Sequence, residues 1–224
     1  MRKTTKILAA AALLGTSALA QAADTKVGIL MDITGPIASF IPPLQNAANL
    51  AIKEVNEQGG LLDGQAVAIY GDTTGSSQGA VDAAGKLINV ENVPIIMGAL
   101  MSGTTIAAAE AAAIPAGVVQ ISPTATSPAM TDIKDNDLLY RIVPSDNYQG
   151  EVLAKIVMDE GIKKVAVTYV NNDYGVGIGQ TFIDAYKAAG GEVAAPAFSE
   201  IARLTLRHLN VPSGEERAFV LHRA

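Results

Sequence analysis

The chain of 224 residues has no cysteine and no tryptophan, and only 4% of its residues are aromatic. Without cysteine, disulfide bonds and thiolate chemistry are both excluded. So few aromatic side chains predict a core made mainly of Ala, Val, Ile and Leu. Basic residues are also in the minority, and the net charge of −6 argues against nucleic acid or an anionic membrane surface as a partner.

Long apolar runs are scarce too, and no segment approaches the roughly 18 uninterrupted apolar residues that suggest a membrane-spanning helix. The N-terminus has positive charges at residues 2, 3 and 6, an apolar stretch at 7–19 and a small-x-small sequence ending at Ala22. These features in this order predict an export signal cleaved near Ala22, the alternative being a buried N-terminal helix. No cysteine follows the stretch, which excludes a lipid anchor at that point.

The next part of the chain alternates between strand and helix patterns. Short apolar segments rich in β-branched residues predict strands at 26–31, 67–70, 93–97, 118–121 and 139–143. Helical spacing of apolar residues predicts helices at about 42–58, 76–90 and 104–113. This alternation predicts an α/β fold with a parallel sheet covered by helices on both faces.

A break at 144–147 (PSDN) interrupts this alternation and marks an expected lobe boundary. Helices are predicted after it at 148–160 and 176–189, with strands at 164–170 and 192–198. The expected division is a signal peptide (1–22), an N-terminal α/β lobe (23–144), a partial second α/β lobe (145–199) and a tail (200–224).

The tail differs from the rest of the chain in its basic residues. Residues 1–199 hold ten Lys and two Arg, whereas residues 200–224 hold four Arg, both histidines and no Lys. Chance in a short segment is one explanation of this compositional change. The other is that the tail is not native to the fold, as in a frameshifted or truncated gene product.

Two turns rich in hydroxyl groups follow the third and fourth predicted strands. Ser102 precedes an alanine-rich helix, where it either caps the helix or helps the helix N-terminus to bind a carboxylate. Thr124 and Thr126 lie between two prolines in SPTATSP, which is either a stiff ligand-binding loop or an ordinary turn. In an open α/β sheet both turns lie at the carboxyl ends of strands, where ligands bind.

Tyr174 lies in a predicted turn at 171–175, where it either closes over a ligand or belongs to the surface. The glycines at 175, 177 and 179 lack the G-x-G-x-x-G spacing of a dinucleotide-binding loop. The aspartates at 132, 135 and 137 lack the glycine and distal Glu of a calcium loop. The sequence contains no P-loop and no nucleophile elbow. We therefore expect no catalytic residue, no metal site and no cofactor.

Six segments occur in this order between residues 26 and 198: VGILMDITGP, AIKEVNEQGGLLDGQ, GALMSGTT, ISPTATSP, YRIVPSDNYQG and VAVTYVNNDYGVGIGQTF. Together they resemble the periplasmic binding proteins of branched-chain amino acid ABC transporters, the Leu/Ile/Val-binding type. The resemblance implies a two-lobed type I periplasmic binding fold that closes on its ligand as a hinge, here with an incomplete second lobe. It also implies a periplasmic monomer, not an enzyme, that captures an amino acid and delivers it to an ABC transporter permease.

The resemblance also implies roles for individual residues. Ser102 and Thr126 would bind the α-carboxylate of the ligand through hydroxyl and amide groups. Thr124 would offer its carbonyl to the α-ammonium, and Tyr174 would contribute from the second lobe. Two further aromatic residues are candidates for the cleft wall: Phe40, near the first turn, and Tyr148, at the crossover.

The sequence departs from the family in its length. Family members continue well beyond this chain, and their acidic residue for the ammonium group lies in that later part; Glu215 and Glu216 stand in an unrelated context. Loss of such a charged contact costs on the order of 2–5 kcal/mol, so we expect weakened binding. Two alternative functions stay open: a binding protein for another small solute, such as an amide, urea or aromatic acid, and an exported α/β enzyme.

Overall fold

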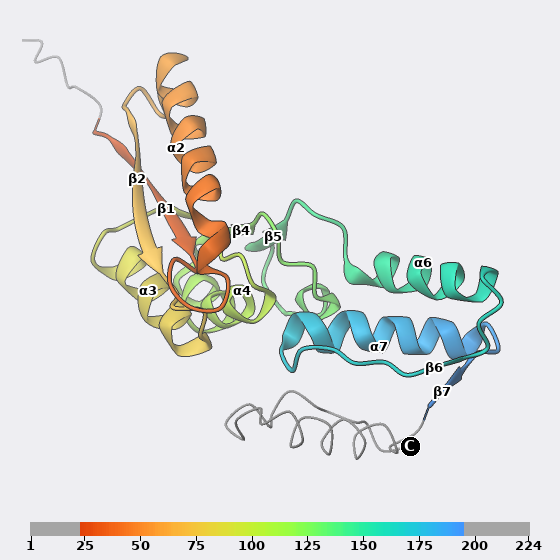
Figure 1. Cartoon of the computed structure of the whole chain (residues 1–224). Helices are drawn as coiled ribbons and strands as arrows, with labels where there is room; N and C mark the ends of the chain where they lie inside the picture. The colour runs from red at the N-terminus through yellow and green to blue at the C-terminus, as the bar shows by residue number, and fades with distance from the viewer. Residues whose placement is uncertain (1–22, 195–224) are drawn as a thin grey trace, which may run out of the picture.

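The structure is a computed structural model that describes residues 23–194; the expected signal peptide, the tail and the end of the last predicted strand lie outside these residues. Its main feature is a five-stranded parallel sheet with strand order β2-β1-β3-β4-β5 (Figure 1). The strands are β1 (Thr25–Met31), β2 (Ala66–Asp72), β3 (Ile95–Met97), β4 (Val119–Ser122) and β5 (Leu139–Arg141). The predicted parallel sheet is confirmed.

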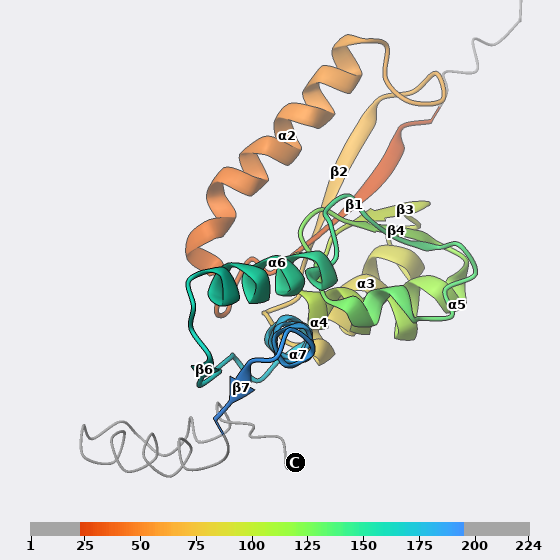
Figure 2. The same cartoon turned by 90° about the vertical axis from the view of Figure 1, so that its right-hand side faces the viewer.

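Helices cover both faces of this sheet, as Figures 1 and 2 show. The covering helices are α2 (Ile41–Glu57), α3 (Ser77–Asn89) and α4 (Ser102–Ala108). Side chains of β1 alternate between the faces: Ile29 and Met31 pack with α2, whereas Leu30 packs with residues of α3 and α4. The residues from 27 to 31 are all buried, as a strand covered on both sides requires.

The alanine-rich helix is irregular along its length. α4 continues into a π-helical turn, η2 (Ala109–Ala113), and then into the short α5 (Ile114–Ala116). Pro115 has no N–H to bond to the carbonyl of residue 111, and the wider turn before it accommodates this loss. Gly117 ends the helix in the left-handed conformation, with φ of 69°.

Two strands of the sheet are shorter than the sequence predicts. β3 begins at Ile95 rather than at residue 93, because Pro94 has no N–H to donate to a neighbouring strand. β5 ends at Arg141 rather than at residue 143. The last bond beyond it runs from Ile142 N to Ser122 O at 3.2 Å, where its neighbour β4 also ends.

A smaller unit follows β5. Its elements are α6 (Asp146–Asp159), β6 (Lys164–Val165), α7 (Asp173–Ala188) and β7 (Glu192–Val193). β6 and β7 pair in parallel as a separate two-stranded sheet, while α6 and α7 lie against each other and extend away from the large sheet (Figure 1). A Cβ at Gly150 of α6 would lie 2.7 Å from the Thr181 side chain of α7, so a glycine permits this close packing.

The start of α7 differs from the prediction of a turn at 171–175 and a helix from 176. Asn172 caps the helix by accepting a hydrogen bond from Gly175 N at 2.9 Å, so α7 begins at Asp173. The glycines at 175, 177 and 179 therefore lie within a helix. A Cβ at Gly179 would come within 2.4 Å of the Tyr169 ring, which shows that this glycine serves packing.

The predicted strand over 164–170 is wrong beyond Val165, where β6 ends. Its partner β7 ends at Val193, one residue before the end of the described range. The last bond described between these two segments runs from Ala194 N to Val165 O at 2.7 Å. Two 3-10 turns complete the described elements: η1 (Ala38–Phe40) and η3 (Pro128–Thr131). In the part of the chain from 23 to 194, no helix has the length and apolar character needed to cross a bilayer.

Candidate functional site

The large sheet has a switch point between β1 and β3. The chain leaves β1 for β2 on one side and returns to β3 on the other. Ligands of open α/β sheets bind at the carboxyl ends of the strands beside such a point. The loops after β1, β3 and β4 begin at this edge, and the last two contain the hydroxyl-rich turns.

Asp32, the first residue after β1, ties this edge together. Its side chain is fully buried. One carboxylate oxygen accepts hydrogen bonds from the N–H groups of Leu100 (3.0 Å) and Met101 (3.1 Å), and the other accepts one from the Thr73 hydroxyl (2.5 Å). These three donors stabilise the buried carboxylate. Asp32 therefore joins the ends of β1, β2 and β3.

Gly98 lets the loop after β3 pass close to β1. Its φ is +128°, and a Cβ at this position would lie 1.8 Å from the carbonyl oxygen of Leu30. Only glycine has both the conformational freedom and the small size for this approach. The loop that carries Ser102 therefore starts directly on the end of β1.

Hydrogen bonds join the segment from the end of β3 to the start of α4 with the end of β4 and the loop after it. They run from the Ser122 hydroxyl to Ala99 O (2.7 Å), from the Thr124 hydroxyl to Leu100 O (2.6 Å) and from Ser127 N to the Ser102 hydroxyl oxygen (3.2 Å). The two hydroxyl-rich turns thus lie side by side at the switch point.

Ser102 does not cap the alanine-rich helix, so the prediction of a capping role is wrong. Met101 occupies the cap position, and it makes no side-chain cap bond. The Ser102 side chain is instead turned toward Ser127, from whose N–H it accepts a hydrogen bond. The Asp32 carboxylate accepts hydrogen bonds from the two N–H groups just before the helix.

Several backbone groups of these loops are unpaired. The first N–H groups of a helix have no acceptor within the helix, and the first bond of α4 runs from Thr105 N to Met101 O. The N–H of Ser102 is therefore free of helical bonding. Within residues 23–194, the N–H of Thr126 and the carbonyl of Thr124 also lack a hydrogen-bond partner. Two donors and one acceptor on adjacent loops can bind a carboxylate and an ammonium group.

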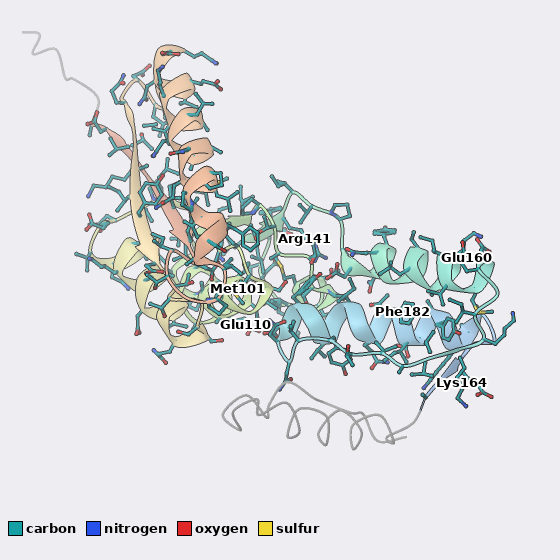
Figure 3. All side chains as sticks on the ribbon, in the orientation of Figure 1. Met101, Glu110, Arg141, Glu160, Lys164 and Phe182 are labelled. Atoms are coloured by element: carbon teal, nitrogen blue, oxygen red, sulfur yellow. The ribbon has the colours of Figure 1, made fainter. Side chains whose placement is uncertain are left out.

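Thr126 is held in a corner formed with Arg141 and Asp146. Its hydroxyl donates to Asp146 Oδ2 (2.7 Å), while its carbonyl accepts from Asp146 N (2.9 Å) and from Arg141 Nη1 (3.2 Å). Burial raises the pKa of the Asp146 carboxyl, and the Thr126 hydroxyl and the Arg141 charge offset only part of this rise. Figure 3 shows Arg141 on the same side of the molecule as Met101, far from Glu160 and Lys164 at the other end of the helix pair.

The first turns of α7 lie against both loops. A Cβ at Gly103 would come within 2.6 Å of the Asp173 carboxylate, and a Cβ at Gly177 within 3.1 Å of the Ser127 hydroxyl. Tyr174 lies between these two contact points along α7, and its side chain is 42% exposed. The structure thus brings the element that carries Tyr174 to the edge where Ser102 lies.

The two residues expected in the cleft wall are placed differently. Phe40 is the last residue of η1 and is 66% exposed, and Tyr148 lies in the first turn of α6 and is 68% exposed. Whereas hydrogen bonds tie the loops of Ser102, Thr124 and Thr126 together, these two aromatic rings stand exposed on separate elements.

Residues 24–203 match the model of the periplasmic binding protein family. This chain belongs to that family. The Leu/Ile/Val-binding protein of Rhizobium johnstonii is 31% identical over 191 residues. The leucine-, isoleucine-, valine-, threonine- and alanine-binding protein of Pseudomonas aeruginosa is 30% identical over 195 residues. These alignments cover 83% and 86% of this chain but 51% and 52% of the relatives, so the chain spans about half of their length.

Solved structures give the same fold. The leucine-binding protein of Thermotoga maritima aligns with a TM-score of 0.70 and 26% identity, covering 82% of this chain and 53% of that one. The branched-chain amino acid binding protein of Streptococcus pneumoniae, in complex with isoleucine, has a TM-score of 0.68 and 31% identity, covering 77% and 49%. A Rhodopseudomonas palustris protein in complex with 3,4-dihydroxybenzoic acid, at 23% identity, covers 83% and 52% with a TM-score of 0.68.

The family and the type I periplasmic binding fold expected from the six sequence segments are therefore confirmed. The relatives of this binding protein are solute-binding proteins rather than enzymes. No group of three or more acidic or histidine residues within the described range 23–194 is placed to hold a metal ion.

The sequence did not predict a role in this edge for three charged residues. Asp32 was assigned to a turn, and Arg141 and Asp146 lie near the expected lobe boundary. Each binds groups that are far away in the sequence: Asp32 and Leu100 are 68 residues apart, and Thr126 and Asp146 are 20 apart. The one available signal is position, because Asp32 directly follows an apolar strand at the expected ligand edge.

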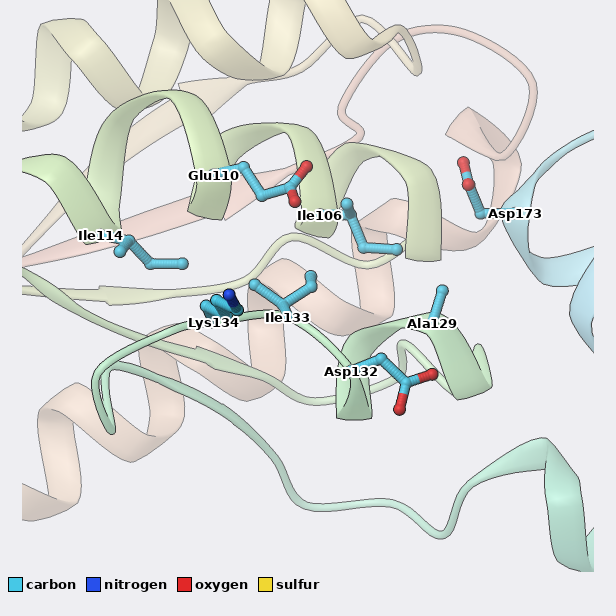
Figure 4. Close-up of a pocket in the computed structure, with 8 residues that line it drawn as sticks. All are labelled: Ile106, Glu110, Ile114, Ala129, Asp132, Ile133, Lys134 and Asp173. Atoms are coloured by element: carbon cyan, nitrogen blue, oxygen red, sulfur yellow. The ribbon is translucent and has the colours of Figure 1, made fainter.

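Two cavities lie outside this edge. One of about 630 Å³ lies between the α4–η2–α5 segment and η3, and Glu110, Asp132, Lys134 and Asp173 line it together with three isoleucines (Figure 4). The other, of about 430 Å³, lies between β2 and α3. Neither is lined by Ser102, Thr124 or Thr126. At the hydroxyl-rich edge Ser102 is buried, with 2% of its surface exposed, whereas Thr126 is half-buried and Thr124 is exposed.

Proposed function

We propose that this periplasmic binding protein captures an amino acid and delivers it to an ABC transporter permease. The branched-chain amino acids are the leading candidates for the ligand. In this proposal residues 1–22 direct export to the periplasm, and the ligand binds between the lobes formed by residues 23–144 and 145–199. The relatives named for leucine, isoleucine and valine binding support this ligand class.

The adjacent turns at the switch point carry the proposal. The free N–H groups of Ser102 and Thr126 suit the two oxygens of an α-carboxylate, and the Thr124 carbonyl suits an α-ammonium group. The Ser102 hydroxyl accepts from Ser127 N, so its own proton is available to a carboxylate. Tyr174, Phe40 and Tyr148 are then the candidates for contact with the rest of the ligand.

An aromatic acid is the second candidate, because a protein of the same fold is in complex with 3,4-dihydroxybenzoic acid. Such a ligand has the carboxylate but lacks the ammonium group. It would leave the Thr124 carbonyl unpaired, and a site that hydrogen-bonds a polar ligand group discriminates against analogues without it. The amino acid therefore fits the described groups better.

Calorimetry and thermal unfolding of the full chain test the proposal with leucine, isoleucine, valine and 4-hydroxybenzoate as probes. We expect the amino acids to raise the unfolding temperature, since a ligand that binds only the folded state stabilises it. Binding of 4-hydroxybenzoate without any response to the three amino acids would favour the second candidate. Turnover of a probe would show an enzyme instead.

Replacement of Ser102 tests the site itself. Ser102→Ala removes a hydrogen bond to a charged group, which contributes about 1.5–3 kcal/mol, and we expect at least tenfold weaker leucine binding. Ser77→Ala, at an exposed serine that begins α3, is the matched control and should bind as the unchanged chain does. Equal binding by both variants would contradict the assigned role of Ser102.

A further inference from the structure

The two hydroxyl groups assigned to the ligand carboxylate are not equivalent. The Ser102 oxygen accepts a hydrogen bond from Ser127 N, which leaves its proton free to be donated. The Thr126 hydroxyl donates its single proton to Asp146 Oδ2 at 2.7 Å. A hydroxyl group has one proton to donate, so Thr126 cannot donate to Asp146 and to a ligand carboxylate at the same time.

The Asp146 carboxylate is poorly satisfied where it lies. The residue is only 1% exposed, and within the described residues its Oδ1 atom is buried without a hydrogen-bond partner. A carboxylate with one bare oxygen in such a place is costly in its charged form. If the Thr126 hydroxyl turned away to a ligand, Oδ2 would lose the side-chain hydrogen bond that it accepts from Thr126.

Among the described residues, no neighbouring side chain is placed to replace the Thr126 hydroxyl as a donor to Asp146. Burial raises the pKa of Asp146 and the charge of Arg141 lowers it in part, but the Nη groups of Arg141 are engaged elsewhere. Its Nη1 donates to the carbonyls of Thr126 and Ser127, and its Nη2 donates to the Thr131 hydroxyl. The remaining charged residues of the neighbouring elements are Asp132 at the end of η3, Glu151, Lys155 and Asp159 on α6, and Asp173, Asp184 and Lys187 on α7.

We propose that Asp146 is a positioning residue that competes with the ligand carboxylate for the Thr126 proton, and that a proton taken up by Asp146 on binding ends this competition. In the free protein Thr126 donates to the charged carboxylate. In the complex a proton from solvent sits on Asp146 Oδ2 and is donated to the Thr126 oxygen, so Thr126 can donate its own proton to the ligand. This inference rests on the proposed function, because it requires a carboxylate at Thr126.

The direction of the pH dependence follows from this exchange. The Thr126 hydrogen bond lowers the pKa of Asp146 in the free protein. Its loss, together with a nearby ligand carboxylate, raises that pKa in the complex. The complex therefore holds more protons than the free protein, and affinity rises as pH falls between the two pKa values, by at most about tenfold per pH unit.

The first test needs no ligand. A carboxyl-carbon NMR titration of the full chain should show a higher pKa for Asp146 in Thr126→Val than in the unchanged protein. Thr126→Ser keeps the hydroxyl and should leave that pKa unchanged. An Asp146 pKa that is the same in Thr126→Val and in the unchanged protein would overturn the proposal whether or not leucine binds.

The second test measures leucine binding by calorimetry from about pH 5 to about pH 7.5, where leucine keeps both charges, in two buffers with different ionisation enthalpies. We expect proton uptake and tighter binding at lower pH. Asp146→Asn should remove both effects, and Asp132→Asn, at an exposed aspartate, should keep them. Binding without proton uptake overturns the proposal. If leucine fails to bind at any pH, the proposed function fails, and the titration above still decides whether Asp146 holds the Thr126 proton.

Discussion

The unit formed by β1 to β5 with its covering helices, here called the sheet unit, is packed very differently from the unit of α6, α7, β6 and β7, here called the helix-pair unit. Among residues 23–194, the three clusters of buried hydrophobic side chains all lie in the sheet unit. In the described helix-pair unit the buried hydrophobic residues are Ala154 and Tyr186. Large apolar side chains are instead exposed along one side of α6, at Tyr148, Val152 and Ile156.

This difference shows where the stability of the described fold comes from. The sheet unit buries apolar surface on both sides of its strands, which is the main favourable term in folding. The helix pair relies on glycine-mediated contact between two helices and on a short ladder. Regions with few buried apolar contacts open more easily than core regions. The hydroxyl-rich turns therefore belong to the unit with the larger buried apolar core, and Tyr174 to the unit with the smaller one.

The largest expected effect is that of Gly98→Ala in the sheet unit. The added Cβ would lie 1.8 Å from the Leu30 carbonyl oxygen and overlap it. The positive φ at this position is also unfavourable for alanine. We expect a loss of about 4 kcal/mol or more, or failure to fold, measured by urea denaturation. Gly85→Ala, in the open middle of α3, is the control and should stabilise by up to about 1 kcal/mol. Similar unfolding curves for the two variants would contradict the close approach at Gly98.

Asp32→Ala should have the next largest effect. It leaves two buried N–H groups and the Thr73 hydroxyl without their acceptor, and each unsatisfied buried group costs about 1–3 kcal/mol. We expect about 3 kcal/mol of destabilisation by urea denaturation. Asp82→Ala, at an exposed aspartate of α3, should stay within about 0.5 kcal/mol. An equally small effect at Asp32 would mean that this residue does not hold the strand ends together.

Asp72→Asn should have a moderate effect that depends on pH. Burial raises the pKa of Asp72, but hydrogen bonds from Thr74 N and from the amide and hydroxyl of Thr34 outweigh it and hold the pKa below its usual value. This stabilisation is present above the usual Asp pKa of about 3.9 and is lost as pH falls through the lower folded value. We expect about 1–2 kcal/mol of destabilisation at neutral pH, shrinking in acid. If the difference in unfolding free energy between the variant and the unchanged protein grew in acid, the lowered pKa of Asp72 would be contradicted.

Tyr186→Phe probes the helix-pair unit. The variant keeps the ring, which stacks on Phe182 at 5.5 Å, but loses the hydrogen bond from the hydroxyl to Ile162 O at 3.0 Å. A cost of about 1 kcal/mol is expected. Hydrogen exchange should become faster in the amides of α7 while those of β1 stay unchanged. Equal acceleration in both would show that the two units open together, and that the helix-pair unit is not the less stable of the two.

The smallest effect is expected for Val152→Ser on the exposed side of α6. Val152 is 57% exposed, so little buried apolar surface is lost, and the free energy of unfolding should change by no more than about 0.5 kcal/mol. Val27→Ser, at a valine of β1 that is 7% exposed, is the matched comparison and should cost several times more in the same measurement. A large effect at Val152 would show that this side of α6 is covered in solution.

Much of the sheet unit could be predicted from the sequence. Its strands are short apolar runs separated by amphipathic helices, and that alternation limits the possible arrangements to a parallel α/β sheet. Errors are found where a local pattern depends on a partner: Pro94 shortens β3, Asn172 moves the start of α7, and β6 is only as long as its described neighbour. A capping role was one of the two roles considered for Ser102, yet α4 has no side-chain cap, and Asp32 binds the loop before it from 68 residues away in the case of Leu100.

The amino-acid sequence alone determined the fold class, the family and the two hydroxyl-rich turns, because apolar periodicity and local motifs can be seen along one segment at a time. The tertiary structure alone decided which polar groups are already engaged. Only contacts between distant residues show that Ser102 has a free proton, that the proton of Thr126 is donated to Asp146, and that Asp32 binds the loop before α4. The physical reason is that each hydroxyl or carboxylate has few hydrogen-bonding positions, and the fold determines which neighbour occupies them.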